Sequence, residues 1–211
     1  MMRAVGLIIA VLGGATPALA FEGVLHQTTT IAQLPPMTSE VSVRQNGDTR
    51  TDSIVPGTGE SVSVIQRTSG TAVITVTLMH AKKMYTEMTA KTDAPPPAGA
   101  AEMLKNLEVK IVGDETIAEH ACKHVQLIQS SDTTIDVWMA ADISIAGETA
   151  RNPQGIAAGM LKMFEEKGVK GFPLQMKATH AGQSLTLTTT RVDMKKLDPA
   201  MFEVPKGYTK M

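Results

Sequence analysis

Most of this chain alternates β-branched or aliphatic residues with small polar ones. The alternation is clearest over residues 60–67, 71–79 and 184–192, where Val, Ile or Leu take turns with Ser or Thr. A side-chain period of two is typical of β-strands with one buried face. Residues 84–89 then predict the return strand of a hairpin that begins with 71–79.

A second hairpin is predicted from residues 116–128 and 133–140, with its turn at Ser130-Ser131-Asp132. The last alternating segment, 184–192, predicts the closing arm of a final hairpin. Runs of hairpin-connected strands exclude a doubly wound parallel fold, which needs a long helical crossover between strands.

Two segments have helical rather than strand periodicity. Residues 98–107 follow a proline-rich linker at 94–97 and place Ala101, Leu104 and Leu107 on one helical face. In the second segment Asn152 is suited to the N-cap and Pro153 to the first helical position. Its apolar stripe consists of Ile156, Met160, Met163 and Phe164, and Lys167-Gly168 ends it. The sequence therefore predicts an α+β domain, a large antiparallel sheet with helices on one side.

The first 20 residues have the features of an export signal. Arg3 precedes a short apolar run, Pro17 interrupts it, and Ala18-Leu19-Ala20 provides a small-x-small cleavage pattern. The run is too short to span a bilayer. We expect cleavage after Ala20, a periplasmic or secreted protein without a transmembrane segment, and a single domain over residues 21–211.

Charge and length narrow the classes of function. The chain has 211 residues and a formal charge of −1, which gives no electrostatic reason to expect a nucleic-acid partner. A domain of this size buries enough apolar surface to fold without a disulfide or a structural metal. No cofactor is expected.

The most distinctive segments lie in the C-terminal half. They are Val137-Trp138-Met139-Ala140-Ala141-Asp142, Gly171-Phe172-Pro173-Leu174-Gln175-Met176-Lys177, and residues 197–208, LDPAMFEVPKGY. Together they resemble an uncharacterised family of bacterial exported domains grouped with the LolA/LolB lipoprotein-carrier superfamily. The resemblance implies a strongly curved antiparallel sheet, an incomplete barrel, with helices covering its open side. It also implies a hollow that takes acyl chains in the carriers, but it assigns no functional residue.

Methionine is unbranched and adaptable, and it lines surfaces that accept varied apolar shapes. We therefore predict that the hollow is lined by Met84, Met88, Met103, Met160, Met163 and Phe164. The alternative is that these residues simply fill the core. The function predicted is that of a non-enzymatic periplasmic carrier or binding protein for an apolar ligand, a lipid or an acylated polypeptide such as a lipoprotein.

An alternative function is periplasmic copper or zinc binding. On a strand His120, Cys122 and His124 would share a face, and a thiol with two imidazoles suits either metal. Same-face neighbours are about 6.6 Å apart, however, which is far for ligands of one ion. In the competing interpretation a turn over residues 118–121 leaves His120 exposed, Cys122 buried and His124 at the rim. Cys122, the only cysteine, is buried and inert, a ligand, or paired between chains.

Catalytic motifs are not evident. The chain lacks a Gly-x-Ser-x-Gly elbow, a His-Glu-x-x-His pair and a phosphate loop, and His26, His80 and His180 stand apart in the sequence. The C-terminal segment 197–208 predicts a single turn whose Phe202 and Tyr208 pack down to cover a sheet edge or the barrel end. A last alternative is a non-catalytic module that presents a sheet edge to an envelope protein partner.

Overall fold

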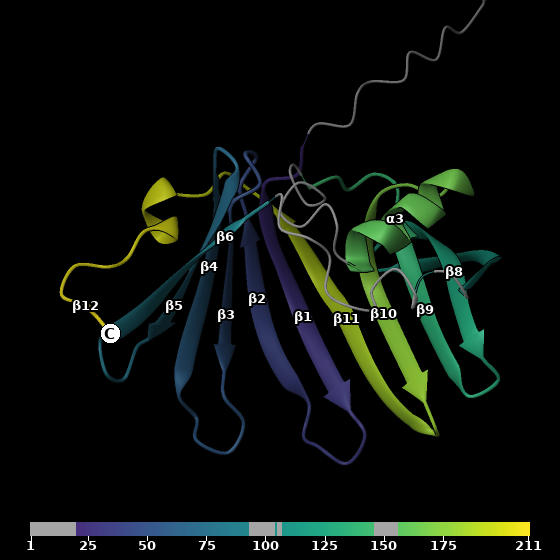
Figure 1. The fold of residues 1–211 in the computed structure, drawn as a ribbon, viewed down its shortest axis with the longest axis horizontal. Helices are drawn as coiled ribbons and strands as arrows, with labels where there is room; N and C mark the ends of the chain where they lie inside the picture. The colour runs from purple at the N-terminus through teal and green to yellow at the C-terminus, as the bar shows by residue number, and fades with distance from the viewer. Residues whose placement is uncertain (1–19, 93–103, 105–106, 146–155) are drawn as a thin grey trace, which may run out of the picture.

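The protein is mostly β (Figure 1). The computed structural model describes residues 20–92, 104, 107–145 and 156–211. Its strands are β1 (Gly23–Ile31), β2 (Met37–Val43), β3 (Thr49–Ile54), β4 (Ser61–Ser69), β5 (Ala72–Met79), β6 (Met84–Lys91), β7 (Glu108–Ile117), β8 (His120–Ser130), β9 (Thr133–Ala140), β10 (Phe172–His180), β11 (Gln183–Met194) and β12 (Thr209–Lys210). The described helices are α3 (Ile156–Glu166) and the short 3₁₀ helix η1 (Pro199–Phe202).

All of these strands belong to one 12-stranded sheet in the order β12-β6-β5-β4-β3-β2-β1-β11-β10-β9-β8-β7. Neighbours are antiparallel except β12, which runs parallel to β6 through Thr209 and Lys210. The prediction of a purely antiparallel sheet is therefore wrong at this edge. A tight hairpin forces antiparallel pairing, whereas β12 arrives through the C-terminal segment, which imposes no such direction.

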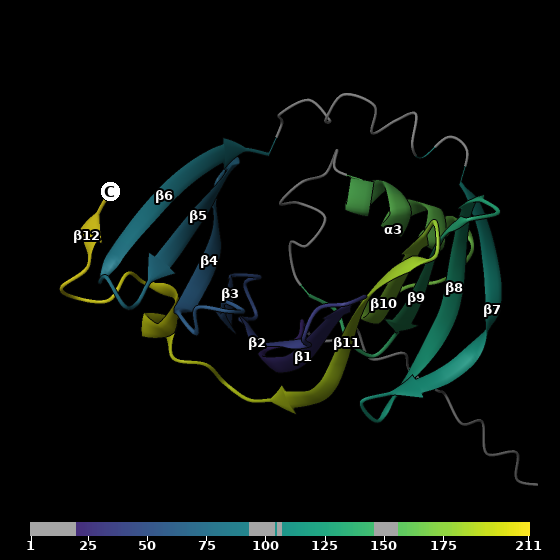
Figure 2. The same cartoon turned by 90° about the horizontal axis from the view of Figure 1, so that it is seen from below.

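The sheet is open and bends without curling strongly (Figure 2). Closing a barrel requires hydrogen bonds between the first and last strands, and here β12 and β7 lie at opposite ends of the strand order. The expected strongly curved, incomplete barrel is therefore corrected to a single bent sheet.

The helix α3 confirms part of the helical prediction. It ends as expected: Val169 N–H donates to the Phe164 carbonyl and Gly168 N–H to the Glu165 carbonyl, with Gly168 at φ 75°. This is a Schellman motif, in which glycine relieves the strain of the left-handed position. Within the described residues no helix is both long and apolar enough to cross a bilayer.

Several predictions lie outside the described residues. They are the signal segment 1–20 apart from Ala20, the linker 94–97, the cap residues Asn152 and Pro153, and the helix 98–107 apart from Leu104 and Leu107. For these positions the sequence-based expectations stand as predictions.

The strand register divides the sheet into two faces. Val137, Met176 and Leu187 are directly paired across β9, β10 and β11, and they share the face that α3 covers, here called the inner face. Ile65 and Val76 are paired on the opposite, outer face, where they pack with Leu197 and Phe202 of the C-terminal segment. Figure 2 shows α3 inside the bend of the sheet and η1 outside it.

The predicted hairpins are present, with one correction. Residues 116–128 do not form one strand, because Ala118 and Glu119 make a two-residue turn with φ of 47° and 69° that separates β7 from β8. Such turns usually carry Asn or Gly, so Ala-Glu offers little sequence signal. The C-terminal segment behaves as expected: Phe202 is buried, Asp198 caps η1, and β12 covers part of the β6 edge.

Candidate ligand-binding face

Charge is segregated across the half of the sheet formed by β1–β6. Its charged residues, Glu40, Arg50, Asp52, Arg67, Glu87 and Lys91, all lie on the outer face. The inner face of the same strands carries Leu25, Gln27, Thr29, Ile31, Met37, Ser39, Val41, Val43, Thr49, Thr51, Ser53, Val62, Val64, Gln66, Thr68, Val73, Thr75, Thr77, Met79, Met84, Thr86, Met88 and Ala90. Aliphatic groups, hydroxyls and two amides therefore form an uncharged surface.

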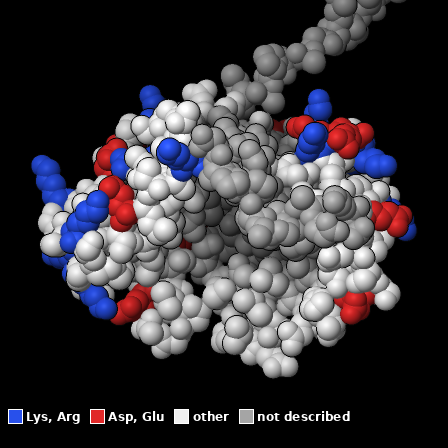
Figure 3. Space-filling model, viewed as in Figure 1, with Lys and Arg blue, Asp and Glu red and all other residues white. Residues whose placement is uncertain are grey.

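Most of these inner-face side chains are half-buried, among them Val41, Val64, Thr75 and Thr77. Figure 3 views the molecule from this side, and the charged side chains of described residues that it shows lie toward the edge of the view. The inner face beneath α3 is buried, because Phe164 and Val169 pack there against Val125, Leu127 and other core residues. Among the described residues, α3 thus covers the inner face over β8–β10 and not over β1–β6.

The residues predicted to line a hollow are dispersed. Phe164 is fully buried under α3, with Met160 half-buried beside it and Met163 also half-buried on the helix. Met84 and Met88 lie on the inner face of β6, Met88 being 72% exposed. Met103 lies outside the described residues. The structure thus places Met84 and Met88 on the uncharged face but puts Phe164 in the core.

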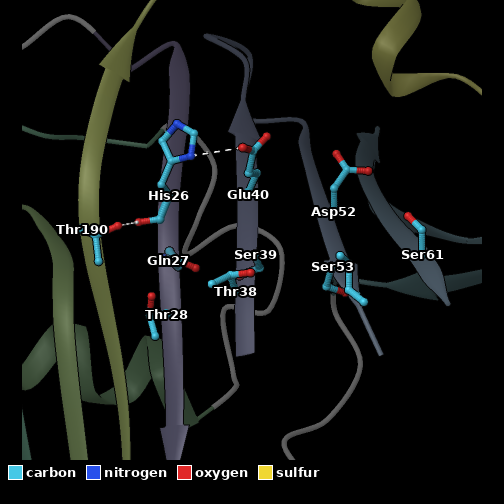
Figure 4. A pocket seen from close by; sticks show the side chains of 11 residues that line it. His26, Gln27, Thr28, Thr38, Ser39, Glu40, Asp52, Ser53, Ser61 and Thr190 are labelled. Atoms are coloured by element: carbon cyan, nitrogen blue, oxygen red, sulfur yellow. Dashed lines mark hydrogen bonds and ion pairs between the residues drawn. The ribbon is translucent and has the colours of Figure 1, made fainter. Parts of the chain in front are cut away.

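A polar pocket of about 370 Å³ lies across β1, β2 and β3 on the outer face (Figure 4). His26 Nδ1 is 3.2 Å from a Glu40 carboxylate oxygen, and His26 Nε2 is 3.0 Å from one of Asp193. The pocket is lined by hydroxyl-bearing and charged residues, including Thr28, Thr38 and Asp52. Hydrogen bonding to His26 is the main reason that the pKa of Asp193 is below its usual value, so this carboxylate is ionised at neutral pH.

The sequence suggested that His80 stands alone, but in the structure it has two hydrogen-bond partners. Its Nε2 is 2.6 Å from Ser63 Oγ and its Nδ1 is 2.6 Å from Tyr208 Oη. Ser63 Oγ donates to Asp52 and accepts from Arg50 Nη2, so His80 Nε2 must be the donor in its contact with Ser63. An imidazole that donates to a serine cannot remove its proton, and Ser63 is fully buried. This network therefore binds the C-terminal segment to the sheet and does not form a nucleophile.

The network gives stability a defined pH dependence. Burial raises the pKa of Asp52, but hydrogen bonds from Arg50 and Ser63 outweigh it, and the pKa in the folded state lies below the usual value. A carboxyl with a depressed pKa contributes stability that is present above the unfolded-state value of about 3.9 and is lost as pH falls through the folded-state value.

We therefore expect Asp52→Asn to be less stable than the wild type at pH 7, with a difference that shrinks below about pH 4. Urea unfolding between pH 2.5 and 7 measures it. Glu60→Gln, at an exposed position, serves as the control and should follow the wild type. A difference that stays constant over this range would contradict the linkage.

The residues of the metal hypothesis have other partners. His120 Nδ1 is 2.7 Å from Asp142, and His124 Nε2 is 2.8 Å from Asp136 while its ring stacks on Trp138 at 4.2 Å. Cys122 is buried in a cluster with Phe21 and Trp138, and this burial is the main cause of its raised thiol pKa. Among the described residues no group of three or more His, Cys, Asp or Glu side chains is arranged to hold a metal ion. The turn lies at Ala118-Glu119 and Cys122 is buried, as in the competing interpretation, but His120 is half-buried and not exposed.

The fold and this face define a class: an open, mostly β domain with a bent sheet whose inner face is uncharged over β1–β6. Residues 21–208 match the family described as a domain of unknown function (DUF4412), and the chain belongs to that family. No curated protein matches the chain.

Solved structures are similar at low identity. An uncharacterized conserved protein from Thermus thermophilus aligns with a TM-score of 0.52 and 9% identity over 90% of each chain. The Pseudomonas aeruginosa MucA/MucB complex aligns at 0.47 and 11%, over 88% of this chain and 56% of that one. A LolA superfamily protein from Nitrosomonas europaea aligns at 0.34 and 10%, over 89% and 91%. These identities are too low to transfer a function to this chain, so its function must be argued from its own side chains.

Proposed function

We propose that this protein is a non-catalytic binding or carrier domain of the bacterial envelope that holds an apolar ligand, a lipid or an acylated polypeptide, on the inner face of its sheet. The observation that carries the proposal is the placement of every charged residue of β1–β6 on the outer face. Most side chains of the inner face keep part of their surface exposed, so burial in the core does not by itself account for the exclusion of charge.

An apolar ligand does require it. A charged group that contacts an acyl chain loses hydration without gaining a partner, and this costs several kcal/mol at full burial. Threonine and valine present methyl groups on a pleated surface, and methionine adapts to varied shapes. Leu187 and Thr29, paired on β11 and β1, continue this surface toward Met176 and the edge of α3. The export signal predicted over residues 1–20 supports an envelope location.

The test uses two consecutive threonines of β1. Thr29 is on the inner face and Thr28 on the outer face, and both are half-buried. Thr29→Lys should weaken binding of a fluorescent fatty acid at least ten-fold, because the ammonium is placed against the chain. Thr28→Lys, the matched control, should stay within two-fold of the wild type while it perturbs the outer pocket. Fluorescence titration of the mature protein measures both.

Two results would overturn the proposal. One is a wild-type protein that takes up no acyl probe by titration and carries no lipid in native mass spectrometry. The other is equal loss of binding in both lysine variants, which would locate the ligand elsewhere. Circular dichroism of each variant separates lost binding from lost folding.

A further inference from the structure

A pocket lies on the inner face where β1 and β10 end and β11 begins. In Figure 1 these ends of the strands are at the bottom of the sheet. The pocket has a volume of about 260 Å³, and it is lined by Ile31, Ala32, Gln33, Ala178, His180, Gln183, Ser184 and Leu185. Ala178 pairs with Leu185, and Leu185 with Ile31, so these aliphatic groups lie side by side on the inner face. The same column of pairs continues upward to Met176 and Leu187.

Polarity changes along this column. At the rim His180 is paired with Gln183, one register step of two residues beyond Ala178 and Leu185. Further in, Met176 pairs with Val137, which packs under α3. The face is therefore hydrogen-bonding at its lower edge and wholly apolar near the helix, an order that matches a molecule with a polar head and one apolar chain.

The polar rim is held in place by the backbone. Ala181 and Gly182 form the two-residue turn of the β10–β11 hairpin with φ of 48° and 78°, and Ala181 N–H donates to the Asp132 carbonyl. His180 and Gln183 are the residues that flank this turn. The backbone that carries their side chains is thus fixed, and both side chains lie on the same side of the sheet as Ala178.

The chemistry of the rim selects an uncharged head. The pocket lining contains amides, a hydroxyl and an imidazole but no Lys, Arg, Asp or Glu. The nearby charge is negative: Asp132 accepts hydrogen bonds from Ser130 and Thr133, and Thr133 in turn contacts His180 Nδ1 at 2.8 Å. A phosphate or carboxylate head would find no Lys or Arg in the lining and would lie near the negative charge of Asp132. Hydroxyl groups, by contrast, can both donate to and accept from the lining side chains.

We propose that this pocket is the headgroup subsite for a single-chain amphiphile with an uncharged, hydroxyl-bearing head, whose chain extends along Leu185 and Leu187 toward α3. This inference rests on the function proposed above. It adds the class of ligand and its direction on the sheet.

The experiment compares three probes with one acyl chain: 1-monomyristoylglycerol, myristate and myristoyl lysophosphatidylglycerol. Each displaces a fluorescent acyl probe from the mature protein at pH 7.5. We expect the monoacylglycerol to bind about five-fold or more tightly than either anion. Gln183→Ala and His180→Ala should each weaken the monoacylglycerol about five-fold, the size of one net hydrogen bond, and leave methyl myristate unchanged. Thr179→Ala, on the outer face of the same strand, is the control and should change nothing.

The outcomes separate this inference from the proposed function. If no acyl compound binds the wild type, the proposed function fails. If acyl compounds bind but the anions bind as tightly as the monoacylglycerol, or if the Gln183 and His180 variants match the wild type, only the headgroup subsite is overturned. Thermal unfolding of each variant shows whether a loss of affinity reflects a loss of folding.

Discussion

Gly171→Ala is expected to destabilise this domain more than any other single methyl addition to a described residue. Gly171 has φ of 112°, a conformation that L side chains rarely adopt, and a Cβ there would overlap the backbone carbonyl of Ala140. The left-handed strain alone costs roughly 1–3 kcal/mol, and the overlap with main-chain atoms adds to it. Because Phe172 pairs with Ala140, relief would require β10 to move away from β9.

We expect a loss of at least about 3 kcal/mol, which in a domain of this size lowers Tm by roughly 10 °C or prevents folding. Thermal and urea unfolding measure it. Gly113→Ala is the matched control, since nothing lies within 4 Å of a Cβ built there, and it should stay close to the wild type. If Gly171→Ala has the same Tm and urea midpoint as the wild type, β9 and β10 can separate at little cost in free energy.

Phe202→Ala carries the second largest expected effect. Phe202 is 1% exposed and packs with Val24, Ile65 and Leu78 on the outer face. Truncating a buried phenylalanine to alanine lowers the free energy of unfolding by about 3–5 kcal/mol, because the transfer free energy of the ring is lost and a cavity is left behind. The loss should also loosen the C-terminal segment, whose remaining links include Arg67 with Glu203 and His80 with Tyr208.

Urea unfolding and tryptic cleavage after Lys206 report the two consequences separately. Met201→Ala, at the neighbouring half-buried position, should destabilise the protein far less. It should leave intact the hydrogen bond that Arg50 Nη1 donates to the Met201 carbonyl. If the free energy of unfolding of Phe202→Ala is within about 1 kcal/mol of the wild-type value, the C-terminal segment contributes little to the core of the sheet.

Together these residues show how the described helices and the C-terminal segment stabilise one open sheet. The C-terminal segment covers part of the outer face of β3–β5, and α3 covers the inner face of β8–β10. A third cluster, which includes Phe21, Cys122 and Trp138, packs residues of β1 and β2 with residues of β8 and β9. Among the described residues, α3 and the C-terminal segment leave uncovered the inner face of β1–β6, the adjoining ends of β10 and β11, and the polar outer pocket across β1–β3.

Short-range patterns were reliable guides to this protein. The alternation over 71–79 and 84–89 predicts the β5–β6 hairpin, and Lys167-Gly168 predicts the end of α3. These features depend on residues within a few positions of one another. The β7–β8 turn was missed because Ala118-Glu119 lacks the usual turn residues, and the parallel β12 was missed because its partner is more than a hundred residues away.

Alternation by itself determined that each strand has two unlike sides, and hence that the chain is a β-rich domain with hairpins. Only the tertiary structure decided which side of each strand lies on the same face of the sheet as the sides of its neighbours. Glu40, Asp52 and Ser63 come into line, and His80 joins them, because the strand register brings them together across β2–β5. Register depends on pairing between distant segments, so the uncharged inner face became visible only once every strand was placed.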